Sequence, residues 1–504
     1  MGRAGASAVV ACATRVTQRL VFRDVNVLDG SGGAAQRGDV SVVADEIEAV
    51  GSVPAGQVEV DGRGRYLAPG FIDVHAHDDA AVLAMPDMTF KLAQGCTSVV
   101  VGNCGFGLAA LTGAAEPPGN ASLFGAARRR FARLRDYFDA VTAAQPTLNV
   151  ASLVGHANLL VSVLGDAERS PSADERARLR ALTAQALDDG AVGLSTGLIY
   201  RPGRSASQEE IAELAALCGE RGLIYTTHMR SESARLLEAV DEAIAIGKLG
   251  RCRVQVSHHK AAGQRNWGKT RETHARFAQA AAEGVDIAFD VYPYTAGSGP
   301  LIEYFDAAKP DLELLDVTRL ASCPPFPELE ARMLVDIARE QGTTVPELVA
   351  RILAGPGGER TLCITFTMAD DDLERNLTHP RSMIGSDGLA DLSGKPHPRL
   401  FGTFPRVLAH YVRERQLLAL PEAVRKMTSV PAERFGLAGR GRIAAGMKAD
   451  LVLFDAETVK DEADYDAPQR LPKGVDCVVV NGALAYGSGV ISRAGRVLTS
   501  SVSR

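Results

Sequence analysis

Residues 68–79 read APGFIDVHAHDD, the stretch that decides the fold. The apolar run from Phe71 to Val74 predicts a strand, and the histidines His75 and His77 follow at its end. Because side chains two positions apart in a strand point to the same side, both imidazoles can share a metal ion. An H-x-H pair on its own can also be a chance surface feature, so its meaning depends on the rest of the chain.

The region after this stretch alternates strands with amphipathic helices, which is typical of a parallel α/β arrangement. Eight strands are predicted, at 71–77, 97–105, 149–157, 191–200, 223–230, 253–260, 285–294 and 382–388. Eight is the number that closes a TIM-like (β/α)8 barrel. Ser172 and Ser207 each precede a Glu by three residues, as in capping boxes, and Leu236, Val240 and Ile244 form a helical stripe.

The two ends of the chain share short β-branched runs bounded by Gly and Asp. They predict one small β-sandwich domain built from both ends. A gap of roughly 85 residues between the seventh and eighth strands is too long for an ordinary loop and predicts an inserted subdomain over the barrel mouth. The expected division is a disordered extension at 1–19, a β domain at 20–68 plus 436–504, and a barrel at 69–435 with 300–375 as the lid.

Composition narrows the class of partner. The chain has 504 residues, with 55 Lys and Arg against 61 Asp and Glu, and its net charge of -6 leaves no basic footprint for nucleic acid. No apolar run is long enough to predict a membrane span. Eight cysteines without paired spacing indicate a reducing compartment, so we expect a cytoplasmic protein that acts on a small molecule.

Four further residues with metal or acid–base chemistry fall at the ends of predicted strands: Cys104, His228, His258 and Asp387. Taken singly, a cysteine is usually a buried thiol and a loop aspartate usually a turn former. Their coincidence with the histidine pair at one barrel rim favours a metal hydrolase. Thiolate and imidazole ligands favour zinc, and Asp387 would take the proton of an attacking water.

Two neighbours of these residues are predicted to be structural. Cys96 starts the strand that Cys104 follows, so it lies at the opposite end from the rim. His259 follows His258 and alternates to the other face, where it packs.

Nine motifs together carry a family resemblance: APGFIDVHAHDD, GNCG, GLIYRPG, THMRSE, SHHK, YPYTAGS, MIGSDG, HPRLFGTFPRVL and GRIAAGMKADLVLFD. In this order, over about residues 20–495, they closely resemble the N-acyl-D-amino-acid deacylases (D-aminoacylases) of the amidohydrolase superfamily. GNCG, SHHK and YPYTAGS separate this family from hydantoinases and dihydroorotases, which use a carboxylated lysine as bridging ligand.

The resemblance implies a role for each site residue. A tightly held zinc ion would be bound by Cys104, His228 and His258, and a second, weaker metal site would be offered by His75 and His77. Asp387 matches the general base. The substrate α-carboxylate would be held by Lys260, Arg399 and Tyr200; the alternatives are a surface salt bridge for Lys260 and Arg399 and a packed strand end for Tyr200.

The implied reaction is zinc-dependent hydrolysis of an N-acyl-D-amino acid to a carboxylate and the free D-amino acid. Relatives that select acidic D-amino acids resemble one another in using a basic residue near the end of the seventh strand, where this chain offers Glu303. We therefore expect neutral or apolar side chains. A hydrolase of dipeptides or cyclic amides is the alternative, and a scaffold without activity is a more remote one.

Overall fold

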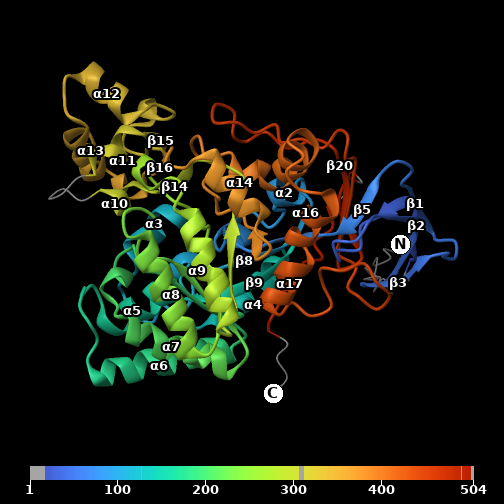
Figure 1. Cartoon of the computed structure of the whole chain (residues 1–504), viewed down its shortest axis with the longest axis horizontal. Coiled ribbons are helices and arrows are strands. Elements are labelled where there is room, and N and C mark those ends of the chain that lie inside the picture. Colours follow the sequence, from blue (N-terminus) through green and yellow to red (C-terminus); the bar gives the residue numbers. More distant parts are fainter. Residues whose placement is uncertain (1–17, 126–127, 306–310, 488, 490, 501–504) are drawn as a thin grey trace, which may run out of the picture.

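The computed structural model describes residues 18–125, 128–305, 311–487, 489 and 491–500. The extension expected at 1–19 falls almost wholly on residues 1–17, outside the described residues. The described chain forms a helix-covered barrel, a β domain on one side of it and a smaller subdomain that projects from the opposite side (Figure 1).

All eight predicted strands are confirmed, and they lie parallel in one sheet in their order along the chain. They are β6 (Phe71–Asp73), β8 (Cys96–Val101), β9 (Asn149–Gly155), β10 (Gly193–Gly197), β11 (Ile224–His228), β12 (Arg253–Val256), β13 (Ile287–Val291) and β17 (Ser382–Ile384). A short parallel pair, β7 (Ala76–His77) with β18 (Gly388–Leu389), joins the first strand region to the last. The strands thus form the expected TIM-like barrel, nearly closed.

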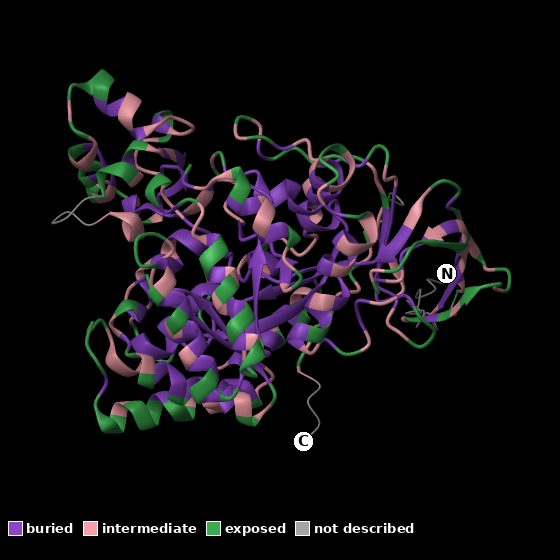
Figure 2. Ribbon diagram, viewed as in Figure 1, coloured by how far each residue is buried: buried purple, intermediate pink, exposed green. Residues whose placement is uncertain are grey.

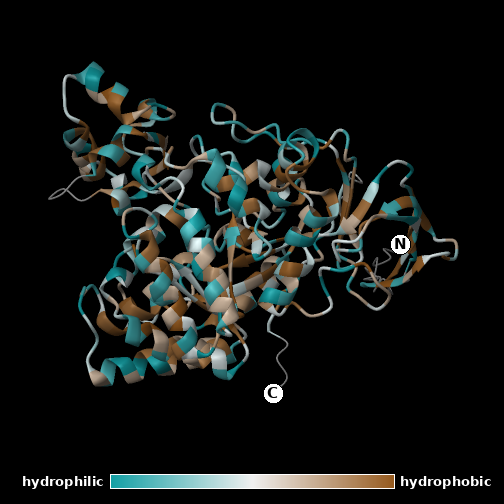
Figure 3. Ribbon diagram, viewed as in Figure 1, coloured by the Kyte–Doolittle hydropathy of each residue, from teal (hydrophilic) through white to brown (hydrophobic). Residues whose placement is uncertain are grey.

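Helices cover the outside of the barrel. The longer ones are α4 (Leu134–Ala144), α5 (His156–Leu164), α6 (Ala173–Asp188), α7 (Gln208–Glu220), α8 (Leu236–Gly250), α9 (Thr270–Ala282), α14 (Asp370–Thr378), α15 (Arg399–Arg406) and α16 (Leu420–Met427). The shorter ones are α1 (Ala81–Ala84), α2 (Thr89–Leu92), α3 (Pro118–Phe124) and α17 (Ser429–Phe435). The barrel strands are buried and the outer helices alternate buried with exposed residues (Figure 2). Hydrophilic segments lie correspondingly toward the periphery (Figure 3).

Local sequence explains these elements. Strand β9 is buried along its whole length, as expected for a parallel strand covered on both faces. Helix α6 begins with the predicted capping box between Ser172 and Glu175. At α7 only half of the predicted box forms, because the Ser207 side chain accepts from the backbone of Glu210 without the reciprocal bond. The stripe on α8 is buried as predicted.

The two chain ends meet in one mixed eight-stranded sheet, consistent with the expected β-sandwich. Its strands are β1 (Leu20–Val27), β2 (Gln36–Val43), β3 (Glu46–Gly51), β4 (Val58–Asp61), β5 (Tyr66–Pro69), β19 (Leu451–Phe454), β20 (Val475–Val480) and β21 (Ala483–Tyr486). The first three strands pair antiparallel, whereas β4 and β5 pair parallel to β1.

An insertion between β13 and β17 has its own hydrophobic cluster, which includes Leu320, Leu334 and Ile352. Its elements are β14 (Gly297–Pro300), α10 (Leu301–Tyr304), α11 (Leu312–Asp316), β15 (Thr318–Ser322), α12 (Leu334–Gln341), α13 (Val345–Ala354) and β16 (Leu362–Thr365). The inserted subdomain is thus confirmed, and it contains a three-stranded sheet that the sequence did not predict.

Two further observations concern the whole described chain. Within the described residues, no helix combines the length and the apolar character needed to cross a membrane. The seven cysteines among those residues are all free and buried.

Candidate active site

The carboxyl ends of the barrel strands bring the six predicted side chains together, all of them buried. They form three overlapping clusters in which the potential ligand atoms lie within 4.8 Å of one another. The clusters are His75 with Cys104 and His258, His75 with His77 and Asp387, and His228 with Glu232 and His258. The structure thus joins the residues that the sequence placed at separate strand ends.

Cys104 lies in a tight turn after β8 that depends on its glycines. Gly102 has a φ of 78°, and a Cβ on it would lie 2.3 Å from the carbonyl oxygen of Leu153. The turn directs the Cys104 Sγ to 3.3 Å from His75 Nε2 and 3.5 Å from His258 Nε2. Burial would raise the pKa of the Cys104 thiol, but the His75 and His258 imidazoles outweigh burial and hold that pKa well below its usual value. The thiolate is therefore the form that this environment favours.

His75 and His77 point to the same side, as the strand period predicted. The Oδ1 of Asp387 lies 3.4 Å from His75 Nε2 and 3.3 Å from His77 Nε2. Burial would raise the pKa of Asp387, but Arg399 and the neighbouring imidazoles hold it well below its usual value. A carboxylate that stays ionised can act as a base or ligate a metal ion.

The environment of His228 tests whether these residues fit a metal ion. Its ring centroid lies 4.4 Å from that of His258. Both of its ring nitrogens are buried and make no hydrogen bond among the described residues, although Nε2 lies 3.5 Å from Glu232 Oε2. Because buried polar atoms without a hydrogen bond are costly, such a ring fits a metal ligand. One thiolate with several imidazoles is a donor set that favours zinc.

Two carboxylates that the sequence analysis missed hold the histidine rings from behind. Asp290 on β13 accepts from His75 Nδ1 at 3.0 Å, and Glu232 Oε1 lies 3.0 Å from His258 Nδ1. Metal-ligating histidines commonly use the second nitrogen in this way, which fixes the ring orientation. Asp290 lies within a buried strand, and Glu232 lies in the loop after β11, where it closes the THMRSE motif without having been singled out.

The three residues predicted to hold the substrate carboxylate lie next to this cluster. Lys260 Nζ lies 2.5 Å from Glu232 Oε1, and Arg399 Nη2 lies 2.9 Å from Asp387 Oδ2. Both cations are buried, so the alternative of surface salt bridges is wrong. Tyr200 packs edge-on against the His228 ring, with centroids 4.6 Å apart. Arg399 keeps its Nε and Nη1 without a hydrogen-bond partner among the described residues.

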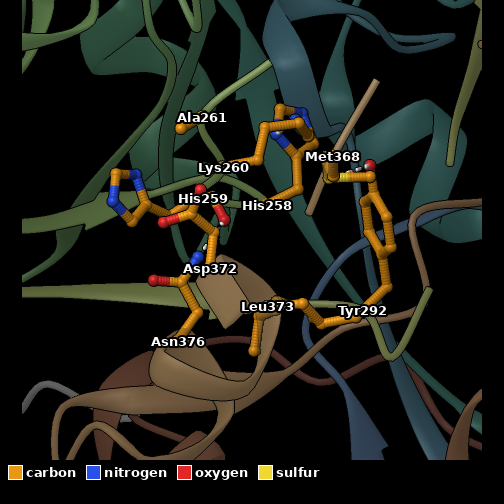
Figure 4. A pocket seen from close by; sticks show the side chains of 10 residues that line it. His258, His259, Lys260, Ala261, Tyr292, Met368, Asp372, Leu373 and Asn376 are labelled. Carbon is orange, nitrogen blue, oxygen red and sulfur yellow. Dashed lines mark hydrogen bonds between the residues drawn. The ribbon is translucent and has the colours of Figure 1, made fainter. Parts of the chain in front are cut away.

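A small cavity is lined in part by His258 and Lys260 (Figure 4). It is lined by residues that include His258, Lys260, Tyr292, Met368 and Asn376, and its volume is about 10 Å³. That volume has room for about one water molecule. The cavity is therefore too small for a substrate.

His259 points away from the metal ligands, as predicted. It packs among Phe277, Phe289 and His274, and its Nε2 lies 2.8 Å from Thr273 Oγ1. Burial lowers the pKa of His259 and of His274, so these rings stay neutral in the folded protein.

Because these buried rings resist protonation, we expect the protein to lose stability in acid. A variant of His379 measures the contribution of that residue to the loss. The His379 ring lies 4.3 Å from that of His274, and burial lowers the pKa of His379 to about 4. The unfolded chain titrates near 6.5, so it binds the proton first, and the free energy of unfolding falls between about pH 6.5 and pH 4. Over this pH range, we expect the free energy of unfolding of His379→Gln to fall by about 1–2 kcal/mol less than that of the parent protein. Denaturant unfolding at pH 7 and pH 4.5 measures the loss of stability of each protein. Equal losses in the variant and the parent would contradict the prediction.

Comparison with known proteins supports a common ancestry over almost the whole chain. A model of the Amidohydrolase family matches residues 58–486. The chain is 42% identical over 488 residues to the N-acyl-D-glutamate deacylase of Alcaligenes xylosoxydans xylosoxydans, covering 95% of this chain and 96% of that protein. It is also 42% identical over 484 residues to the D-aminoacylase of the same organism, covering 95% and 97%.

A solved structure agrees with these matches. The N-acyl-D-glutamate deacylase from Bordetella bronchiseptica, complexed with zinc and a phosphonate mimic of the tetrahedral intermediate, superposes with a TM-score of 0.90. The two are 39% identical, over 96% of this chain and 100% of that one. The chain therefore belongs to the amidohydrolase family and, within it, to the N-acyl-D-amino-acid deacylases.

Proposed function

We propose that this enzyme uses zinc to hydrolyse the amide bond of N-acyl-D-amino acids, giving a carboxylate and the free D-amino acid. The observation that carries the proposal is the buried cluster of Cys104, four histidines and Asp387 at the carboxyl ends of the barrel strands. This is the edge at which barrel enzymes hold their catalytic groups.

Each ligand has an assigned role in this proposal. Cys104, His228 and His258 hold the tightly bound zinc, and His75 and His77 offer a second, weaker site. Two observations support the first assignment: Cys104 Sγ lies close to His258, and the ring nitrogens of His228 make no hydrogen bond among the described residues. Zinc at this position supplies Lewis acidity, which polarises an amide carbonyl and acidifies water.

Asp387 moves the proton. As the base, it accepts a proton from the attacking water and then donates it to the amide nitrogen while the carbon–nitrogen bond breaks. Its position beside the histidine pair supports this role. The products are a carboxylate and an amine, so atoms and charge balance.

Lys260, Arg399 and Tyr200 position the substrate by its α-carboxylate. Arg399 has unpaired donors besides the one that Asp387 engages. Lys260 offers three donors, and its contact with Glu232 engages one of them. A carboxylate held at fixed points presents the amide of only one enantiomer to the metal.

The side-chain preference follows from Glu303 on α10. Its Oε2 accepts from the backbone nitrogen of Arg201 at 3.4 Å, next to Tyr200, and its buried Oε1 has no partner among the described residues. A second carboxylate beside it would be repelled. Neutral or apolar D-amino acids therefore fit better than D-glutamate or D-aspartate.

The test is release of the amine from three compounds by zinc-loaded enzyme. We expect kcat/KM for N-acetyl-D-methionine to exceed that for N-acetyl-L-methionine by at least about 10²-fold. The kcat/KM for N-acetyl-D-methionine should exceed the kcat/KM for N-acetyl-D-glutamate by about 10- to 100-fold. Glu303→Gln should reduce this preference for D-methionine over D-glutamate. Preference for D-glutamate would overturn the side-chain assignment alone. No release from any of the three by enzyme with zinc bound would favour a dipeptide hydrolase.

We also propose the domain limits and the compartment. A β domain at 20–68 plus 436–504, a barrel at 69–435 and a lid at 300–375 are supported by the separate cluster of the insertion. A cytoplasmic location is supported by the free thiols of the described cysteines.

A further inference from the structure

A fully buried lysine lies directly behind the active-site rim. Lys91 on α2 is 0% exposed. Its Nζ lies 2.6 Å from Asp73 Oδ2, 2.9 Å from Ser386 Oγ and 3.2 Å from Asp78 Oδ2. None of these four residues touches the substrate or the metal in the proposed mechanism.

Stability alone does not account for this cluster. Removing charges from water is expensive, and apolar residues of similar volume often serve a protein core as well as a buried ion pair does. This cluster is distinguished by its location beside the active-site residues. Asp73 and Asp78 flank the histidine pair at 75–77, and Ser386 immediately precedes Asp387.

The cluster joins the first and last barrel strands by a continuous set of hydrogen bonds. The Oδ1 of Asp73 accepts from the backbone nitrogen of Ser386 at 2.8 Å and from that of His75 at 3.3 Å. The Ser386 hydroxyl donates to Asp73 Oδ2 at 2.6 Å and accepts from Lys91 and from the Gly388 nitrogen. One donor and two acceptor sites are the full capacity of a hydroxyl, so the arrangement is saturated.

Asp387 needs such support because its backbone is strained. Its φ is 50°, in the left-handed region that few residues other than glycine adopt. Its nitrogen donates to the His75 carbonyl at 2.7 Å. At Gly385, a Cβ would lie 2.7 Å from the Cβ of His75, which shows how closely the two strand ends approach.

We propose that Lys91 is a positioning residue, which holds Asp387 in its working orientation through Ser386 and Asp73. The inference rests on the proposed role of Asp387 as the base. Lys91 acts only through its neighbours, so its loss should affect the rate of turnover more than substrate affinity or zinc content.

The first variant is Lys91→Met, which keeps the length of the side chain and removes its charge. Loss of a residue that orients an active-site group typically costs about 10- to 100-fold in activity. We expect kcat to fall by that factor, with KM changed less than about twofold. Metal analysis should still find the tightly bound zinc.

A second buried lysine serves as the matched control. Lys426 on α16 is also 0% exposed, and it contacts Ser382 at the amino end of β17. Lys426→Met removes a buried charge at the end of the barrel strand far from the rim. It should lower the thermal midpoint, as Lys91→Met does, and leave kcat per folded, zinc-loaded molecule within about twofold.

A double-mutant cycle separates positioning from a general structural role. In the background of Asp387→Asn, Lys91→Met should cause less than about twofold further loss, because the group that it positions is already gone. If both single variants are impaired and their effects multiply, Lys91 does not act through Asp387. If Lys91→Met does not yield folded protein, Ser386→Ala replaces it in the cycle, with an expected loss of about 10-fold.

The outcomes distinguish this inference from the proposed function. Near-normal turnover of Asp387→Asn would overturn the proposed base, and the inference with it. An inactive Asp387→Asn together with normal turnover of Lys91→Met would overturn the inference alone.

Discussion

Cys104→Ala should abolish both tight zinc binding and activity. Among the described residues, Cys104 contributes the one thiolate of the cluster, and its Sγ lies 3.5 Å from His258 Nε2. Without it, two imidazoles remain of the proposed triad, fewer than the three protein ligands of a catalytic zinc site. Because Lewis acidity supplies several kcal/mol to such reactions, we expect kcat/KM to fall by about 10³-fold or more. Metal analysis after dialysis measures zinc content, and amine release measures activity.

Cys96→Ala provides the matched control on the same strand. Cys96 is buried at the start of β8 within an apolar cluster, and burial raises the pKa of its thiol well above the usual value. Its loss should cost about 1–2 kcal/mol of stability and leave the zinc in place. Retention of full zinc content by Cys104→Ala, or zinc loss in both variants, would contradict the assignment of Cys104.

The strand-end residues were predictable because their position follows from short-range rules. A strand of period two sets which way His75 and His77 point, and parallel strands carry their carboxyl ends to one rim. Cys104, His228 and His258 follow from the same argument. The distances among these residues did not follow from the sequence, because they depend on how the strands close around the barrel.

The supporting residues could not be predicted in the same way. Asp290, Glu232 and Lys91 support the site through contacts with His75, His258 and Ser386, which are at least 26 residues away in sequence, and their residue types are common in other roles. The backbone conformation of three site residues is a second feature that the sequence does not predict. Cys104, His258 and Asp387 adopt φ values of 56°, 36° and 50°. Local residue preferences disfavour such strained backbone conformations, and the surrounding fold holds them in place. Sequence patterns therefore do not predict them.

The insertion shows the limit of strand prediction from composition. Strand β14 consists of Gly, Ser, Gly and Pro, all poor strand formers. It forms a strand because it pairs with β16, more than sixty residues later. In the β domain, β4 and β5 pair parallel to β1 for a similar reason, since pairing partners distant in sequence leave no periodic signal.

Asp387→Asn should keep the tightly bound zinc and lose most turnover. The substitution preserves size and still lets an oxygen accept from Arg399, but it removes the group that takes and returns the proton. General acid–base catalysis contributes about 10²- to 10⁴-fold, which is the expected fall in kcat. Zinc should stay because Asp387 clusters with His75 and His77 and is not one of the three ligands proposed for the tightly bound ion.

A second aspartate four residues on separates this role from turn formation. Asp391 accepts from the backbone and hydroxyl of Ser393, as a turn-forming aspartate does. Asp391→Asn should therefore turn over at close to the normal rate. If Asp387→Asn behaves like Asp391→Asn while its zinc is bound, the carboxylate of Asp387 is only a turn former. If Asp387→Asn alone fails, the contacts with the histidine pair and with Arg399 are what convert an ordinary turn residue into the base.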